Sequence, residues 1–315
     1  MPESRERSEL LNELSSLRGR ALITLITSDK KPSELFATQI AGDILPLFYS
    51  LLSQMDSDGG CDLLIYSTGG QIDVPWPLTN LLREYYTDIN VIVPWKAHSA
   101  ATLICLGADK IGMGPLASLS PIDPQFQVQH GDKPVVGAGV EDVYGYYRLI
   151  TETLELDSNG RSEALKLLAT RVTPEILGKI SRVRREIRIV ATNLLQLHMG
   201  DHTKIESIVN ALVEDLPSHQ YLINRVEATS LGLPVFKLND REEKLSFDIL
   251  KSYIEETKMN EPGIAIDFGS EALLEMEVNR AFVETKERSF KFRSKYVFHR
   301  DGKVDKQGDS WQEVS

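Results

Sequence analysis

The chain has 315 residues, with 35 Lys and Arg against 46 Asp and Glu, so its formal net charge is -11. A negative field of this size does not favour nucleic acid or anionic lipid as a general partner. The charged N-terminus has no apolar signal core, and no segment reaches the ~18 apolar residues that a membrane span needs. We therefore expect a cytoplasmic protein with no membrane span and no nucleic-acid partner.

The first half of the chain alternates between β-branched apolar runs and amphipathic segments. Strands are predicted over 21–28, 61–67, 89–95 and 110–114, and helices over 6–18, 39–56, 74–86 and 99–108. Strand and helix in alternation are typical of a mostly parallel sheet in an α/β protein.

The middle of the chain, from Glu141 to Leu216, is predicted to be entirely helical. Its clearest helix begins at an N-cap, Thr173, with Pro174 in the first turn, and ends at Gly200. Apolar residues along 176–197 follow steps of four and three, a heptad seam that needs a partner within the chain or from a second copy. The basic residues beside the seam are either a solvated face or a surface for an acidic partner such as another subunit.

The C-terminal part is predicted to be mixed. Two segments, 203–206 and 224–227, have the spacing of capping boxes that begin short helices. A strand is expected over 234–238, a helix over 241–257 and an edge strand or hairpin over 289–300, whereas the last fifteen residues are predicted to be disordered.

The two cysteines, Cys61 and Cys105, lie in apolar stretches without a nearby Cys or His at metal-ligand spacing. They are expected to be buried reduced thiols. No metal site and no cofactor is predicted.

Two short segments have residues suited to chemistry. Gly69 and Gly70 directly follow the predicted strand 61–67, and glycine lets backbone N–H groups approach an oxyanion or a phosphate. Ser99 lies where the third strand gives way to a helix of small residues, and the Ala100 amide falls in the first helical turn, where amides lack partners within the helix. For Ser99 alone, an N-cap is the simpler interpretation.

The order of "STGG", "HSAATLICLGADKI" and "GPLASLSPIDPQ" resembles the ClpP/crotonase superfold. Within it the chain is similar to the serine dehydrogenase proteinase family, related to signal peptide peptidase A and the Clp proteolytic subunit. The similarity covers roughly 20–240 and includes "SHQYLINRVEATSLGLPV". The resemblance implies a hydrolase domain over 1–240 with a helical insertion at 141–216, and a C-terminal β/α extension over 241–315.

The resemblance makes Ser99 the nucleophile and the Gly70 and Ala100 amides the oxyanion donors, with Gly69 shaping the turn. The sequence departs from the family pattern at two places. Thr68 replaces the usual Pro before the glycine pair, and Ala101 stands where relatives often have Gly two residues after the serine. Alanine there would narrow the cleft, or it would accompany altered or lost activity.

The general base is the open question, because serine is a weak nucleophile without one. The segment that carries the histidine in the Clp subunit has Asp123 here, and the place of its acid has His219. We expect His219 to take the proton from Ser99 and Asp123 to orient His219. Signal peptide peptidases use a lysine instead, and the candidate lysines are Lys133, Lys96 and Lys179.

The sequence therefore predicts a serine hydrolase, most plausibly a peptidase that acts through an acyl-enzyme on peptides or proteins. One alternative is an acyl-CoA-handling enzyme of the crotonase type, which would use the same amides without a serine. Another is a catalytically silent oligomeric scaffold that binds peptides. The resemblance also implies a homo-oligomer, and a separate ATPase or regulatory partner is possible because the chain has no Walker A motif.

Overall fold

The computed structural model describes residues 6–314 except 56–58, 124, 129–135, 171, 217 and 219. The chain forms two compact units. The first comprises residues 1–119 and 223–315, and the second comprises residues 120–222. Within the described residues, no helix is both long enough and apolar enough to cross a membrane.

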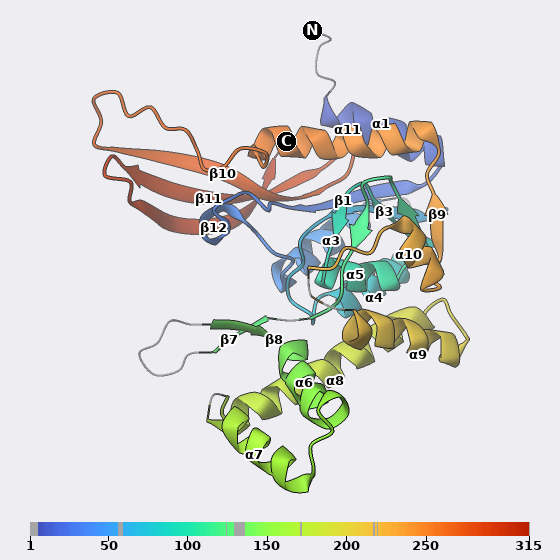
Figure 1. Cartoon of the computed structure of the whole chain (residues 1–315). Coiled ribbons are helices and arrows are strands. Elements are labelled where there is room, and N and C mark those ends of the chain that lie inside the picture. Colours follow the sequence, from blue (N-terminus) through green and yellow to red (C-terminus); the bar gives the residue numbers. More distant parts are fainter. Residues whose placement is uncertain are drawn as a thin grey trace. The chain divides into compact units, whose positions relative to one another are not determined.

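The first unit is built on an eight-stranded sheet in the order β12-β11-β10-β1-β2-β3-β5-β9 (Figure 1). Its parallel strands are β1 (Ala21–Thr27), β2 (Cys61–Tyr66), β3 (Ile89–Val93), β5 (Lys110–Met113) and β9 (Val235–Lys237). The antiparallel strands are β10 (Leu273–Glu284), β11 (Ser289–His299) and β12 (Val304–Val314). The predicted α/β fold with a mostly parallel core is confirmed.

Helices cover both faces of the parallel strands. One face is covered by α1 (Arg7–Arg18) and α11 (Asp240–Thr257), and the other by α3 (Leu45–Leu52), α4 (Pro75–Tyr85) and α5 (Ala100–Leu106) (Figure 1). The shorter elements are α2 (Ser33–Phe36), the 3-10 turn η1 (Gly42–Ile44), β4 (Lys96–Ala97), β6 (Ser118–Leu119) and α10 (Arg225–Ser230). The helix expected over 39–56 is thus shorter, and begins only after η1.

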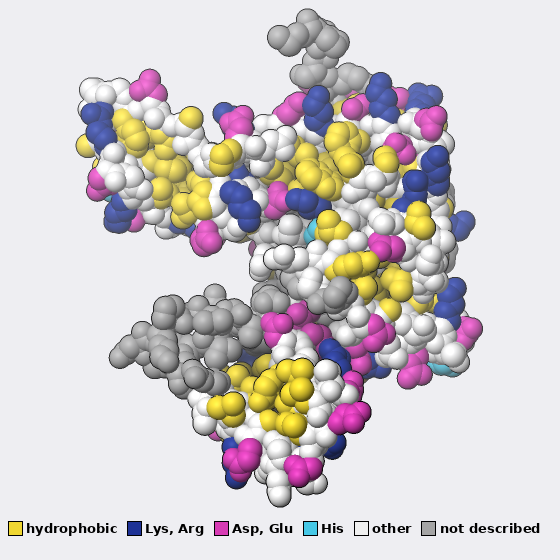
Figure 2. Space-filling model, viewed as in Figure 1, with side chains coloured by type: hydrophobic (Ala, Val, Ile, Leu, Met, Phe, Trp, Pro, Cys, Tyr) yellow, Lys and Arg dark blue, Asp and Glu magenta, His cyan; other side chains and the backbone are white. Residues whose placement is uncertain are grey.

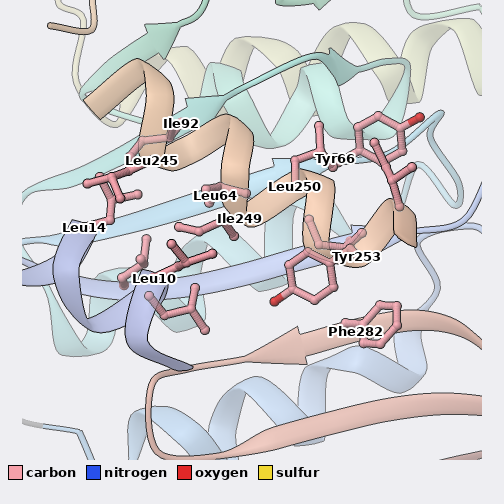
Figure 3. Packing of buried hydrophobic residues seen from close by; sticks show 14 of the residues in the cluster. Leu10, Leu14, Leu64, Tyr66, Ile92, Leu245, Ile249, Leu250, Tyr253 and Phe282 are labelled. Carbon is pink, nitrogen blue, oxygen red and sulfur yellow. The ribbon is translucent and has the colours of Figure 1, made fainter. Parts of the chain in front are cut away.

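The core between the sheet and the helices α1 and α11 explains why β1 and β2 are apolar along most of their length. Leu64 and Tyr66 of β2 point from the sheet toward leucines and isoleucines of both helices (Figure 3). The alternate residues, Leu63 and Ile65, are equally buried on the other face. A strand covered on both faces has no polar side, as the sequence predicted.

The C-terminal strands correct two predictions. Most of the segment predicted to be disordered forms β12 (Val304–Val314), which pairs with β11 along its length, from Ser289 opposite Val314 to Phe298 opposite Val304. Its charged residues, Asp305, Lys306, Asp309 and Glu313, are typical of an edge strand. A strand does form over most of 289–300, as β11, but it lies between β10 and β12, so the prediction of an edge strand there is wrong. β10 joins β11 to β1, and the extension therefore continues the main sheet.

The second unit is mostly helical, as predicted for 141–216. It contains a hairpin of β7 (Gln125–Val128) and β8 (Val136–Gly139) that the sequence analysis did not predict. Its helical elements are α6 (Val140–Arg148), the π-helical turn η2 (Leu149–Thr153), α7 (Ser158–Ala169), α8 (Pro174–Gln196), α9 (His202–Asn210) and the π-helical turn η3 (Ala211–Asp215).

The heptad seam of α8 finds its partner within this unit. Ile180 is buried in a cluster with Val140 of α6 and Val172, and Ile187 and Leu194 are buried further along the helix. Thr173 caps α8 as predicted, by accepting a hydrogen bond from the Ile176 amide at 3.5 Å.

The two predicted capping boxes have different outcomes. The box at 224–227 is confirmed, with Asn224 and Glu227 bonding each other's backbone amides at the start of α10. The prediction of a capping box at 203–206 is wrong. Asp201 caps α9 instead, accepting a hydrogen bond from the Lys204 amide at 3.1 Å, because the helix begins one residue before Thr203.

A buried carboxylate ties the start of β2 to its neighbours. Asp62 is only 1% exposed and forms ion pairs with Arg18 at the end of α1 and, at 2.7 Å, with Arg20. Arg18 also reaches Glu242 of α11 at 2.7 Å. One carboxylate therefore links α1, the start of β1 and β2, and through Arg18 it reaches α11.

We expect Asp62→Asn to lower the free energy of unfolding by about 3–5 kcal/mol, because two arginines would lose their buried counter-charge at nearly constant volume. Urea unfolding measures this change. Glu163→Gln is the control, since Glu163 forms an exposed ion pair with Lys166 and its loss should cost under about 1 kcal/mol. Equal losses in the two variants would contradict a structural role for Asp62.

Candidate active site

The site begins where β2 ends. Beyond Tyr66 the chain remains extended, and Ser67 pairs in parallel with Ala97 of β4. The Ser67 amide donates to the Lys96 carbonyl at 2.9 Å, and the His98 amide donates to the Ser67 carbonyl at 3.0 Å. Because both segments continue from these paired residues, the turn at Gly69 and Gly70 lies beside Ser99.

The Ser67 hydroxyl fixes the conformation of this turn. It accepts hydrogen bonds from the Gly69 amide at 3.0 Å and from the Thr27 hydroxyl at 2.8 Å. The sequence analysis did not identify either side chain. The available signal was a polar residue at the end of the apolar strand in "YSTGG", where a buried hydroxyl needs hydrogen-bond partners.

Gly69 has to be glycine for two reasons. Its φ is 118°, a region that other residues rarely adopt. A Cβ at this position would lie 2.8 Å from the Ser99 Cβ and 3.3 Å from its Oγ. The absence of a side chain at Gly69 is therefore what lets the two segments meet.

Gly70 is held from the opposite side by Ile40. The Ile40 amide donates to the Gly69 carbonyl at 2.9 Å, and the Gln71 amide donates to the Ile40 carbonyl at 2.8 Å. A Cβ at Gly70 would lie 2.1 Å from the Ile40 carbonyl oxygen. Since the C=O and N–H of a trans peptide point in opposite directions and the Gly69 carbonyl faces Ile40, the Gly70 N–H points away from Ile40.

Ser99 has an unusual backbone conformation, with φ 52° and ψ -114° at the junction of β4 and α5. Such a conformation costs about 1–3 kcal/mol in a non-glycine residue and occurs most often at functional sites. Its side chain makes no capping hydrogen bond to α5, so the interpretation of Ser99 as an ordinary N-cap is wrong. The residue is 8% exposed.

The start of α5 holds Ser99 in this conformation. The Ala101 amide donates to the His98 carbonyl at 2.9 Å, and the Thr102 hydroxyl donates to the Ala97 carbonyl at 2.8 Å. The Ala100 amide precedes the first hydrogen-bonded amides of the helix. Of the two departures from the family pattern, Ala101 is fully buried, whereas Thr68 is exposed.

Two polar residues that precede Ser99 have partners among the described residues. The His98 ring nitrogen Nε2 lies 2.9 Å from the Ser118 hydroxyl of β6. The Lys96 ammonium forms an ion pair with Asp29 at 2.6 Å and lies over the Trp95 ring. Lys96, one of the candidate bases, therefore joins β4 to the loop after β1.

The remaining predicted site residues do not belong to the first unit. Asp123 belongs to the second unit, where it is buried and its Oδ1 accepts a hydrogen bond from the Glu141 amide at 3.1 Å. Burial raises the pKa of the Glu141 carboxyl against the effect of Arg184, and the nearby Asp123 charge adds to the rise. Lys179 lies exposed on α8, and His219 and Lys133 fall outside the described residues.

Comparison with known families identifies the class to which this geometry corresponds. Residues 4–136 match the model of the ClpP-like SDH-type serine proteinases. The resemblance predicted from the motifs is thus confirmed, and the matched segment contains Gly69, Gly70, Ser99 and Ala100. At the level of the family, the match is to serine proteinases.

The individual relatives have less informative names. The chain is 27% identical over 236 residues to the uncharacterized protein MJ0137 of Methanocaldococcus jannaschii, covering 73% of each chain. It is 37% identical over 65 residues to MJ1495 of the same organism, also uncharacterized, covering 21% of this chain and 22% of that protein. A solved structure, the 1510-N membrane-bound stomatin-specific protease, is similar at 14% identity with a TM-score of 0.41, covering 65% of this chain and 78% of that one.

We expect Gly69→Ala to lower the free energy of unfolding by about 2–5 kcal/mol, because it combines an unfavourable φ with a steric clash against Ser99. Gly178→Ala is the matched control. Gly178 lies within α8, and a Cβ there meets no atom within 4 Å. This change should raise stability by about 0.5–1 kcal/mol. Chemical unfolding of both variants checks the expectation, which a stable Gly69→Ala protein would contradict.

Proposed function

We propose that this chain is a serine peptidase in which Ser99 is the nucleophile. The observation that carries the proposal is the left-handed backbone of Ser99, held against Gly69 at the end of two neighbouring parallel segments. A strained serine at a strand-to-helix turn exposes its hydroxyl to a substrate, and strain of this kind persists only where the surrounding structure maintains it.

In the proposed reaction, the Ser99 hydroxyl attacks a peptide carbonyl and forms a tetrahedral intermediate. The negative charge on its oxygen is stabilised by the Gly70 and Ala100 amides, one from each of the two segments. The Gly70 amide points away from Ile40, and the Ala100 amide lies in the first turn of α5, so both suit this role. Collapse of the intermediate expels the amine and leaves an acyl-enzyme that water hydrolyses.

For the base we propose His219, oriented by Asp123. An imidazole with an ordinary pKa of about 6.5 is suited to accept the hydroxyl proton and return it to the leaving amine. Asp123 would stabilise the imidazolium that forms on attack. We also propose that the enzyme is a cytoplasmic homo-oligomer that acts on peptides or proteins, with any unfolding energy supplied by a separate ATPase partner.

We expect Ser99→Ala to abolish labelling by a fluorophosphonate probe and to reduce peptide hydrolysis at least about 10³-fold. The fold should be retained, because the Ser99 side chain makes no capping bond to α5. Gel fluorescence, a fluorogenic peptide assay and thermal unfolding measure the three effects.

The control for this variant is Ser230→Ala, at a serine of α10 whose hydroxyl donates only locally, to the Val226 carbonyl. This variant should react with the probe and hydrolyse the peptide at the rates of the parent protein. If the Ser99→Ala variant is still labelled, the nucleophile is another residue. A parent protein that never reacts would instead favour the acyl-CoA enzyme or the silent scaffold.

We expect His219→Ala to slow fluorophosphonate labelling by about 10²–10⁴-fold, with Lys133→Met close to the parent. The parent rate should rise with pH through about 6.5, since only the neutral imidazole accepts a proton. Rates measured from pH 5 to 10 test this. If the labelling rate keeps rising above pH 8 and is lost in Lys133→Met, the general base is a lysine and not His219.

A further inference from the structure

The outer face of α8 carries a basic strip formed by Arg182, Arg185 and Ile189. These residues are three and four positions apart, so they share one side of the helix, opposite the buried Ile180 and Ile187. All three are exposed, and Ile189 is 52% exposed. An isoleucine so exposed between two arginines is not explained by the packing of α8 within its own unit.

The other arginines of α8 have structural roles, which sets the strip apart. Arg184 pairs with Glu141 at 2.7 Å and with Glu214 at 3.1 Å, and Arg188 also pairs with Glu214. In the part of the chain that the structure describes, no carboxylate forms an ion pair with Arg182 or Arg185. The strip is therefore a charged surface without an internal partner.

The same unit presents a segment of opposite character at 149–155, the acidic segment. Leu149 is 43% exposed and Leu154 is 55% exposed, and the exposed Glu152 and Glu155 lie between and beside them. Neither glutamate has an ion-pair partner among the described residues. The Leu154 amide donates to the Leu149 carbonyl at 2.8 Å, and the segment ends at Glu155 with a φ of 46°.

We propose that the basic strip of one copy of this chain docks on the acidic segment of a second copy. Arg182 and Arg185 equal Glu152 and Glu155 in number and are opposite to them in charge, and Ile189 offers an apolar contact to the two leucines. Two basic strips facing each other would repel, so the contact joins different surfaces of the two copies. Figure 2 shows hydrophobic side chains gathered on one face of this unit, and exposed apolar patches often mark contacts between proteins.

The proposal rests on the proposed homo-oligomer and specifies how it forms. Such a contact either forms twice about a two-fold axis, which closes a dimer, or leaves each copy with one surface of each kind unused, so that association continues into a ring or a filament. The full-length chain tests this through its mass in light scattering at micromolar concentration, where the parent should give a multiple of 35.3 kDa.

Charge reversal on either surface should weaken self-association at least tenfold. The two variants are Arg182→Glu with Arg185→Glu, and Glu152→Arg with Glu155→Arg. Mixed together they should reassemble, because every junction then joins opposite charges, and the assembly should hold an even number of chains. Lys251→Glu with Lys286→Glu is the matched control, since both lysines are exposed on the first unit.

The outcomes separate the two proposals. A parent mass of one chain would overturn both the homo-oligomer and this contact, whereas Ser99 labelling would be unaffected. An oligomeric parent that both reversals leave intact would overturn the contact alone, and so would variants that dissociate but fail to reassemble when mixed. A charge reversal could lower the midpoint of thermal unfolding. In that case the double variant Arg182→Gln with Arg185→Gln repeats the test, because it removes the two positive charges without adding negative ones.

Discussion

The close approach of Gly69 to Ser99 is the constraint on which the site depends. With only hydrogen at the Gly69 α-carbon, the extension of β2 passes within van der Waals distance of the serine on the neighbouring segment. The Gly70 and Ala100 amides, which we propose as the oxyanion donors, belong to these two neighbouring segments. Any side chain at Gly69 would separate the segments and remove this geometry.

The strained serine requires a rigid frame, and β2 supplies one because it is fixed at both ends. Near its start, Asp62 is clamped by two arginines. At its end, the Ser67 hydroxyl holds the glycine turn, and its backbone pairs with β4. Between these points the strand is buried on both faces. Tertiary packing of this kind maintains a conformation that costs about 1–3 kcal/mol at Ser99.

The proposed chemistry is divided between the two units. The nucleophile and the oxyanion donors belong to the first, whereas Asp123 belongs to the second and accepts a hydrogen bond from the start of α6. The carboxylate proposed to orient the base thus also anchors the helical insertion. The same insertion carries the basic strip and the acidic segment.

The sequence by itself determined the parallel strands, the glycine turn, the serine position and the helical insertion. Local rules govern each of them: apolar runs for buried strands, glycine for close approach, and regular spacing for helices. Tertiary structure alone decided that Ile40 would hold Gly70, that Lys96 would pair with Asp29, and that β12 would close the sheet. These features depend on register between segments far apart in the chain, which no local pattern encodes.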